Sequence, residues 1–334
     1  MKKYSVIFGV DISKLKLDIV GLNQVHEIVS DYVVIENTKK TITTFIKKYI
    51  KKYGKEHIVF AFENTGVYGY HLGLVLTQLE IDYYNISALE IKRSMGIRSG
   101  KTDKSDSLMI AKYILSNHFD LELSSLPDSV FIELKLLYSQ REKIVKTIKS
   151  FGCNKETKAF LGKKEYKIVK KTTESIVRSL QKNLKVIEQK IEEVITQDEK
   201  LKKTYNLVKS IPGVGPQTAT YLLIVTRGFT CFNSARKFAC YSGVAPFPFQ
   251  SGSSVNGRTK VNHMADKKLK SLLSMCALNS KRFDYQMKTY FDKKVAEGKN
   301  KMLIINNIRN KVLQRIFAVV KRGTPYVNTC AYAS

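Results

Sequence analysis

The sequence predicts a mixed α/β domain at the N-terminus, followed by a helical coiled-coil connector and a mainly α-helical C-terminal domain. Three observations lead to this prediction: short segments of alternating hydrophobicity in the first 125 residues, a long charged helical stretch after them, and glycine-, proline- and aromatic-rich sequence beyond it. We place the domains at 1–125, 126–204 and 205–334.

The first domain contains several strands and helices in a regular order. Apolar runs and alternation predict strands at 4–12, 16–22, 32–35, 58–62 and 82–86. Helical spacing of apolar residues predicts helices at 42–54, 70–79 and 103–115. The first three strands are joined by tight connections, as in an antiparallel meander. The order βββαβαβα requires a mixed sheet with helices on its faces.

The connector is predicted from helical, strongly charged sequence at 128–150 and 164–201. Within it, apolar residues alternate three and four apart, which is the heptad pattern of a coiled coil: Val177, Leu180, Leu184, Ile187, Ile191 and Val194. Such a seam must be covered. The partner helix is either the other segment of this connector or a helix of a second protomer, and the pattern does not choose between them.

The C-terminal domain begins with the segment rich in glycine, proline and serine, and it ends in basic helices. Apolar spacing places these helices around 269–276 and 305–316. Five cysteines are scattered without a C-x-x-C pair, so we expect reduced thiols rather than disulfides or a zinc site. No apolar run approaches the roughly 20 residues of a membrane span, and no signal segment is evident, so we expect a cytoplasmic protein.

The strongest property of the composition is its charge. The 57 lysines and arginines exceed the 29 acidic residues, for a formal net charge of +28. Such an excess predicts a polyanionic partner, because basic side chains that meet phosphates release condensed counterions. A generally basic proteome from an AT-rich genome is the alternative explanation.

Four acidic residues are candidates for a metal site. Asp11 and Glu63 lie near the ends of two predicted strands. Adjacent strands are about 4.8 Å apart, so carboxylates at equivalent ends can share one hard cation such as Mg²⁺. Asp103 and Asp106 are three residues apart at the start of a predicted helix and share a face. Ordinary strand-end charges and favourable helix-dipole interactions are the alternative interpretations.

The sequence resembles the DEDD transposases of insertion sequences. The resemblance is carried by the segments 9–14, 63–68 and 101–106 (GVDISK, ENTGVY and KTDKSD), and it covers nearly the whole chain. It implies an RNase H-like, RuvC-like N-terminal domain in which Asp11, Glu63, Asp103 and Asp106 hold catalytic Mg²⁺. Two such ions, roughly 4 Å apart, can stabilise both the attacking and the leaving oxygen of a phosphodiester.

A second signature of the family involves a serine. Segments 241–246 and 250–254 resemble it, and Ser251 stands at the position of the nucleophile that would form a phosphoserine link with DNA. Without the resemblance, this serine is most simply a loop residue. The family usually has glycine around the position of Ala265; this departure bears on the fine geometry expected of that turn and not on the assignment of Ser251.

Several further residues are candidates for contacts with nucleic acid. The segment 210–216 resembles the turn of a helix-hairpin-helix element, in which glycine amides approach a phosphate, although a plain turn between packed helices has the same composition. Basic side chains next to the acidic residues and after the serine are the other candidates. The complete set is Lys101, Lys104, Gly213, Gly215, Arg258, Lys260, Lys267 and Lys268.

The resemblance also implies partners. It predicts DNA (element ends and target), a structured guide or bridge RNA that pairs with donor and target DNA, and a homodimer or homotetramer. Two other functions stay open on the sequence alone. One is a junction resolvase in which water replaces serine as the nucleophile, and the other is a non-catalytic nucleic-acid-binding protein that has kept the fold.

Overall fold

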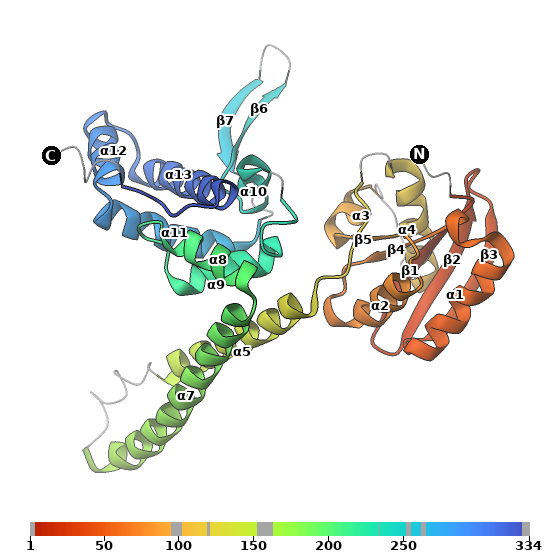
Figure 1. Ribbon diagram of the computed structural model, residues 1–334, viewed down its shortest axis with the longest axis horizontal. Coiled ribbons are helices and arrows are strands. Elements are labelled where there is room, and N and C mark those ends of the chain that lie inside the picture. The colour runs from red at the N-terminus through yellow and green to blue at the C-terminus, as the bar shows by residue number, and fades with distance from the viewer. Residues whose placement is uncertain are drawn as a thin grey trace. The chain divides into compact units, whose positions relative to one another are not determined.

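The computed structural model describes residues 4–94, 102–118, 121–151, 163–232, 234–251, 255–261 and 265–328. The chain divides into two compact units, Met1–Leu126 and Pro127–Ser334 (Figure 1). No helix among these residues has both the length and the apolar character that a membrane crossing requires.

The N-terminal unit is built on a five-stranded sheet with the order β3-β2-β1-β4-β5. β1 runs antiparallel to β2 and parallel to β4, so the sheet is mixed, as predicted. The strands are β1 (Val6–Ile12), β2 (Lys16–Asn23), β3 (Ile28–Glu36), β4 (Ile58–Glu63) and β5 (Tyr83–Ile86). The predicted mixed α/β domain and the predicted mainly helical C-terminal region are both confirmed.

β3 is longer than the strand predicted at 32–35. It begins at Ile28 and pairs with β2 through a register shift around Gly21. The polar Ser30 is buried there, because it packs against Gly21 and its hydroxyl is 2.5 Å from the Tyr49 hydroxyl. A buried polar residue interrupts the alternation, which explains why sequence periodicity detects only the second half of this strand.

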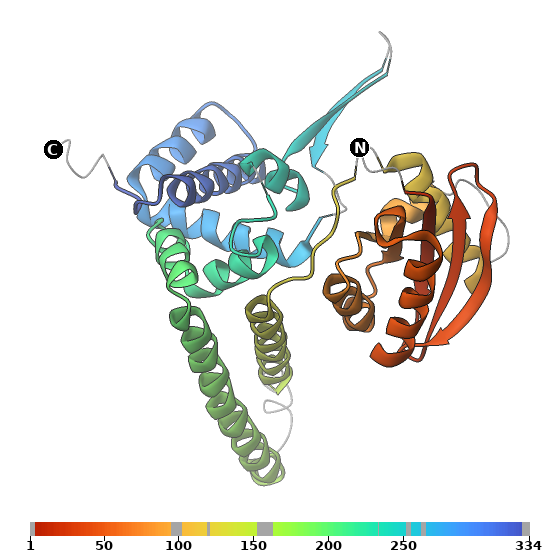
Figure 2. The same cartoon turned by 45° about the vertical axis from the view of Figure 1, so that its right-hand side comes forward.

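Helices cover both faces of the sheet (Figure 2). One face packs against α1 (Lys39–Tyr53) and α2 (Tyr70–Gln78) in a core that contains Phe8, Phe60 and Phe62. The other face packs against α3 (Ala88–Ser94) and α4 (Asp103–Asn117). Two short 3-10 helices, Lys55–His57 and Gly66–Gly69, complete the unit. β1 is therefore buried on both sides and is almost continuously apolar.

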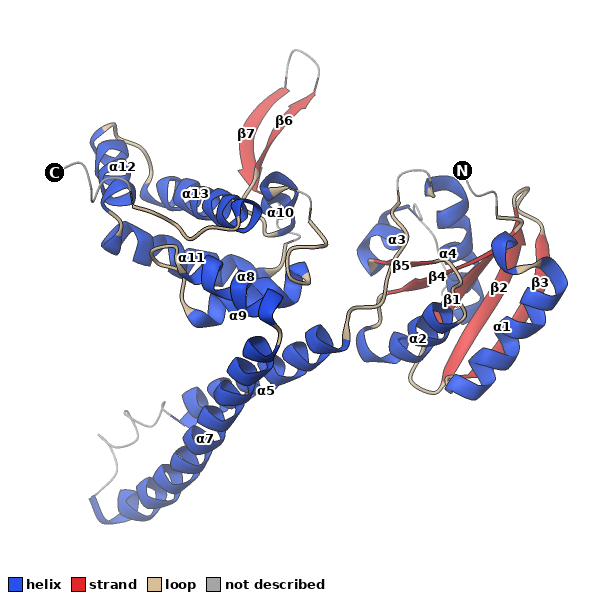
Figure 3. Cartoon of the chain, viewed as in Figure 1, coloured by secondary structure: helices blue, strands red, loops and turns tan. Residues whose placement is uncertain are grey.

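The C-terminal unit is mainly helical (Figure 3). It has its own apolar core. Its helices are α5 (Ser129–Phe151), α7 (Lys163–Gln197), α8 (Glu199–Lys209), α9 (Pro216–Thr226), α10 (Ala235–Tyr241), α11 (Lys267–Phe283), α12 (Tyr285–Ala296) and α13 (Lys301–Arg322). One hairpin, β6 (Pro246–Ser251) with β7 (Val255–Val261), interrupts the helices. The sequence had indicated loop structure there.

The predicted coiled-coil seam is covered, at least in part, within the chain. α5 packs along α7, and Arg141 Nε donates to Glu188 Oε1 at 2.8 Å between the two helices. Ile191 and Val194 of the seam are buried, whereas Val177, Leu180 and Leu184 are only half-buried. The intramolecular alternative is therefore realised at the end of α7 that joins the C-terminal core.

Candidate active site

Asp11 and Glu63 lie at neighbouring positions on adjacent strands. The parallel register of β1 and β4 pairs Val10 with Phe62, and the two acidic residues are the next residue on each strand. Residues two apart on a strand share a face. Because Ile7, Val59 and Ala61 pack against α4, the side chains of Asp11 and Glu63 also point to the α4 side of the sheet. Both are half-exposed, at the open end of that face.

α4 lies unusually close to β1. A side chain at Gly9 would overlap the backbone of α4, since a Cβ there would lie 2.6 Å from Ala111 N. The glycine therefore permits direct contact between helix and strand. Asp11 follows Gly9 by two residues on β1, and Asp106 precedes Ala111 by five residues on α4. The contact between Gly9 and Ala111 therefore places the first turn of α4 near Asp11.

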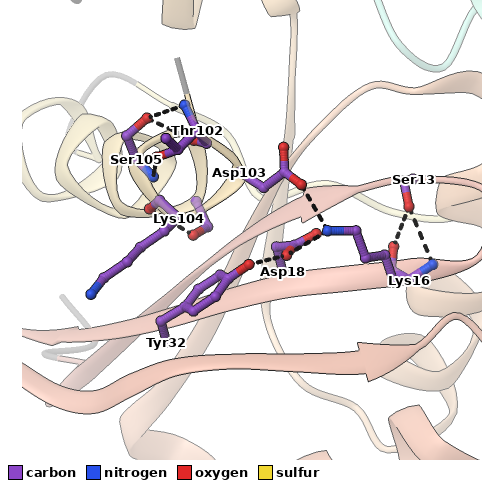
Figure 4. Close-up of polar contacts among 9 residues, drawn as sticks. Ser13, Lys16, Asp18, Tyr32, Thr102, Asp103, Lys104 and Ser105 are labelled. Atoms are coloured by element: carbon purple, nitrogen blue, oxygen red, sulfur yellow. Dashed lines mark hydrogen bonds and ion pairs between the residues drawn. The ribbon is translucent and has the colours of Figure 1, made fainter. Parts of the chain in front are cut away.

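The first turn of α4 is fixed by a capping box. Thr102 Oγ1 accepts a hydrogen bond from Ser105 N at 3.1 Å, and Ser105 Oγ accepts one from Thr102 N at 3.0 Å (Figure 4). These bonds satisfy backbone donors that a helix start leaves free. Asp103 and Asp106 occupy this rigid turn; Asp103 is exposed and Asp106 half-exposed.

The other acidic residues lie within electrostatic range of Asp11. Burial raises the pKa of Asp11 above its ordinary value of 3.8, and the negative charges of Asp106, Asp103, Asp18 and Glu63, in that order, raise it further. Like charges around a partly desolvated carboxylate disfavour its ionised form. The structure therefore brings all four sequence-derived acidic residues to one face of the sheet.

A fifth acidic residue, Asp18, was missed by the sequence analysis. It is the antiparallel partner of Asp11 in β2, and it is almost fully buried. Tyr32 OH donates to Asp18 Oδ1 at 2.5 Å, and Lys16 Nζ donates to the same oxygen at 3.2 Å. A signal was present: an aspartate between apolar residues in a buried strand is unusual unless it is paired.

The donors suit a hard divalent cation, because Mg²⁺ prefers carboxylate oxygens. The residues that could hold it are Asp11, Glu63, Asp103 and Asp106. Among the residues described, however, no three acidic, histidine or cysteine side chains are already gathered around one point. Lys16 Nζ engages Asp103 Oδ2 at 2.7 Å. Side-chain rotations that release Asp103 from this lysine would be required for coordination, and the backbone already places the carboxylates on the same face.

The predicted nucleophile, Ser251, is the last residue of β6. It pairs with Val255 across the hairpin. Arg258 and Lys260 lie on the other strand, and Lys260 is exposed opposite Phe247. Lys101 lies outside the described residues, whereas Lys104 is exposed on α4.

Gly213 and Gly215 have different surroundings in the turn between α8 and α9. Gly213 has a φ of +91° and packs against α11, where a Cβ would lie 2.6 Å from Ser280 N. It is required by backbone conformation and by packing. Gly215 has open space around it and caps α9 without a side-chain hydrogen bond. Gly215 is exposed at this helix start, and its backbone already forms a hydrogen bond with the Cys276 thiol.

Lys267 and Lys268 also differ, although they are adjacent. Lys267 is exposed. Lys268 forms an ion pair with Glu142 of α5, and its ammonium lies 5.9 Å from the centre of the Tyr138 ring. Lys268 therefore connects α11 to α5, which is a structural contact that sequence alone does not reveal.

Comparison with known proteins identifies the family. Residues 8–155 match a family model described as transposase, of the DEDD type of IS110, and residues 205–292 match the transposase IS116/IS110/IS902 family. The chain belongs to the IS110 family of transposases. The predicted family is thus confirmed, and this transposase is a member of a family of recombination enzymes.

Individual relatives show how far the similarity extends. The pilin gene-inverting protein of Moraxella lacunata is 28% identical over 235 residues, which are 70% of each chain. An uncharacterized 43.6 kDa protein of insertion element IS110 from Streptomyces coelicolor is 28% identical over 158 residues, 46% of this chain and 39% of that protein. Among solved structures, T. thermophilus RuvC in complex with a Holliday junction substrate aligns with 37% of this transposase and all of RuvC, at 10% identity and a TM-score of 0.28.

Proposed function

We propose that this transposase cuts and rejoins DNA strands, with Asp11, Glu63, Asp103 and Asp106 as ligands of Mg²⁺ and Ser251 as the nucleophile. The observation that supports it most is the placement of Asp11 and Glu63 at neighbouring ends of β1 and β4, where Gly9 lets α4 approach and the charges of Asp103 and Asp106 act on Asp11. Such a concentration of negative charge is costly in the free protein. A divalent cation would offset it, and this is the arrangement expected of a site that binds metal.

The chemistry can be assigned to residues of this chain. Bound Mg²⁺ would polarise the phosphodiester and stabilise charge that develops on its oxygens. Ser251 Oγ would attack the phosphorus and lose its proton, while the bond from phosphorus to the leaving sugar oxygen breaks and that oxygen is protonated. The phosphoserine bond conserves the energy of the broken one, so a second strand can reverse the step and be joined. The acidic site of the same or of a partner chain would supply the metal.

Two kinds of observation support rejoining rather than simple hydrolysis. Both halves of the chain match transposase families, and the Moraxella relatives are named as proteins that invert a pilin gene. Inversion requires that every cut strand be joined again. The excess of basic residues supports DNA as the polyanionic partner. The guide RNA and the dimer or tetramer stay predictions from the family resemblance.

The decisive experiment follows labelled DNA that spans an element end on a denaturing gel. With Mg²⁺, the wild-type protein should shift the label into a protein-linked band that survives denaturation. Ser251→Ala should lower that band by at least about 10³-fold, because the attacking group is missing. Ser253→Ala and Ser254→Ala are matched controls from the same segment and should retain it.

The other outcomes separate the alternatives. Cleavage without a protein-linked band, unchanged in Ser251→Ala, would indicate that water is the nucleophile, as in a resolvase. Asp11→Asn should abolish both cleavage and linkage while DNA binding persists. If Asp11→Asn left every activity unchanged, the acidic residues would have no catalytic role.

A further inference from the structure

Lys16 carries a positive charge inside the acidic site. Its ammonium lies between two carboxylates, 3.2 Å from Asp18 Oδ1 and 2.7 Å from Asp103 Oδ2 (Figure 4). One of these carboxylates belongs to the proposed metal ligands and the other does not. The lysine therefore connects the start of β2 to the first turn of α4.

The Asp18 side of this bridge is rigid. The Asp18 side chain is 1% exposed and is also held by the Tyr32 hydroxyl. The backbone of Lys16 is fixed as well, because Ser13 Oγ donates to Lys16 O at 2.9 Å and accepts from Lys16 N at 3.2 Å. Breaking a buried ion pair leaves an uncompensated charge, so the ammonium is expected to stay with Asp18.

The Asp103 side is easier to break. The Asp103 side chain is 52% exposed, and an exposed ion pair contributes little because water competes for both charges. Asp103 is also the first residue of α4, where a side chain can change rotamer without disturbing the helix. A divalent cation near Asp11 would attract this carboxylate more strongly than a half-exposed ammonium does.

We propose that Lys16 is a positioning residue with two alternative partners: it holds Asp103 while the site has no metal, and it binds a phosphate oxygen of the DNA once the metal has taken Asp103. The inference rests on the proposed magnesium site. When Asp103 turns away, the ammonium stays anchored by Asp18 but loses its exposed partner. A DNA phosphate beside the metal is the anion that can replace it.

The first test measures metal binding without DNA, with Mn²⁺ as the probe and electron paramagnetic resonance as the readout. Lys16→Met should bind Mn²⁺ about threefold more tightly than wild type, the size expected when an exposed ion pair no longer competes. Lys16→Arg, which retains the positive charge, should bind no more tightly than wild type. Thermal melting of each variant without metal verifies that it is folded.

A matched control separates competition from simple loss of charge. Lys14 is exposed two residues away, and it forms no ion pair with any residue that the structure describes. Lys14→Met removes the same charge from the same turn, and its effect on Mn²⁺ affinity should be clearly smaller than that of Lys16→Met. Equal effects of the two variants, or weaker binding in Lys16→Met, would refute the competition.

The second test measures DNA affinity in EDTA and in Ca²⁺. In EDTA, Lys16→Met should bind DNA nearly as well as wild type, because the lysine is engaged with Asp103. Wild type should bind DNA more tightly in Ca²⁺ than in EDTA, and Lys16→Met should show only a small part of this increase. A loss of equal size in both conditions contradicts the exchange of partners.

These results are distinguishable from failure of the proposed function. If Asp11→Asn leaves Mn²⁺ binding unchanged, the magnesium site itself is wrong. If Asp11→Asn abolishes Mn²⁺ binding while Lys16→Met matches Lys14→Met, only the role of Lys16 is wrong.

Discussion

Gly9 of β1 lies directly against the carbonyl of Ser107 in α4. A methyl group at this position would be 2.0 Å from that carbonyl oxygen and 2.9 Å from the Ala111 Cβ. No rotamer change can relieve such a contact, because one of the atoms belongs to the backbone of a helix. Because glycine has no side chain at this position, α4, which carries Asp103 and Asp106, can approach the sheet this closely.

Gly9→Ala should therefore separate the acidic residues as well as destabilise the fold. We expect the free energy of unfolding to fall by about 1–3 kcal/mol, as for other overpacked sites, and Mg²⁺ to give less thermal stabilisation than in wild type. Gly69→Ala is the matched control, since a Cβ there meets no atom closer than 3.5 Å. Melting curves with and without Mg²⁺ measure both effects. Unchanged metal stabilisation in Gly9→Ala would show that the approach of α4 does not matter for the site.

The state of Asp11 predicts a pH-dependent stability in the absence of metal. Its pKa is raised in the folded protein, mainly by burial and then by the neighbouring carboxylates. The folded protein therefore binds this proton more tightly than the unfolded protein does. Protonated Asp11 stabilises the fold at low pH, and this stabilisation is lost as pH rises from about 3.8 through the raised pKa. At pH 7, Asp11→Asn should melt at the same or a higher temperature than wild type, despite losing activity.

Melting temperatures between pH 7 and pH 5, measured in EDTA, test this. The difference in melting temperature between Asp11→Asn and wild type should become smaller as pH falls. Glu27→Gln is a suitable control, because this exposed carboxylate lies at the far end of the sheet, where Asn23 donates to it. If Asp11→Asn melted at a lower temperature than wild type at pH 7, and if this difference in melting temperature grew towards pH 5, charge repulsion at Asp11 would be contradicted.

Part of this site could be read from the sequence because strand ends are local features. The apolar runs before Asp11 and Glu63 locate both residues at strand ends, and the spacing of Asp103 and Asp106 places them on one helix face. Asp18 could not be assigned in the same way. Its importance follows from the antiparallel register that pairs it with Asp11 and from Tyr32 on a third strand, and register is a tertiary property.

The hairpin of the C-terminal unit was missed for a different reason. Pro246 and Pro248 interrupt β6, and proline in an apolar run normally argues against a strand. A two-stranded hairpin has only edge strands, so a proline nitrogen can face away from the partner without loss of a hydrogen bond. The ion pair between Lys268 and Glu142 was also out of reach, because 126 residues separate the two partners.

The neighbouring lysines at the start of α11 should behave differently in DNA binding. Lys267→Met should lower the salt dependence of DNA affinity, with a slope change of about 0.9 if the side chain meets one phosphate. Lys268→Met should leave that slope nearly unchanged and instead lower the free energy of unfolding by up to about 1 kcal/mol, because Glu142 loses one basic partner and keeps Arg141. DNA titrations at several salt concentrations and urea unfolding of both variants give the comparison. The reverse pattern would show that Lys268 leaves Glu142 to bind DNA.

The base of the β6–β7 hairpin is held by α13, which predicts a remote effect on Ser251. Asn306 Nδ2 donates to Val244 O at 2.9 Å, two residues before β6, and the buried Arg309 donates through Nη1 to Asn306 Oδ1 at 3.2 Å. Asn306→Ala leaves the Val244 carbonyl without this donor, at a cost of about 1 kcal/mol, and should loosen the strand that carries the serine.

The expected result is a lower yield of the protein-linked DNA band at unchanged DNA affinity, together with faster amide exchange in β6 and β7. Asn307→Ala is the matched control, since Asn307 is exposed and contacts the Tyr290 hydroxyl instead. Exchange that rises throughout α13 in Asn306→Ala would indicate general destabilisation. Exchange that rises only in the hairpin, with the adduct reduced, would show that α13 positions the serine through this pair of hydrogen bonds.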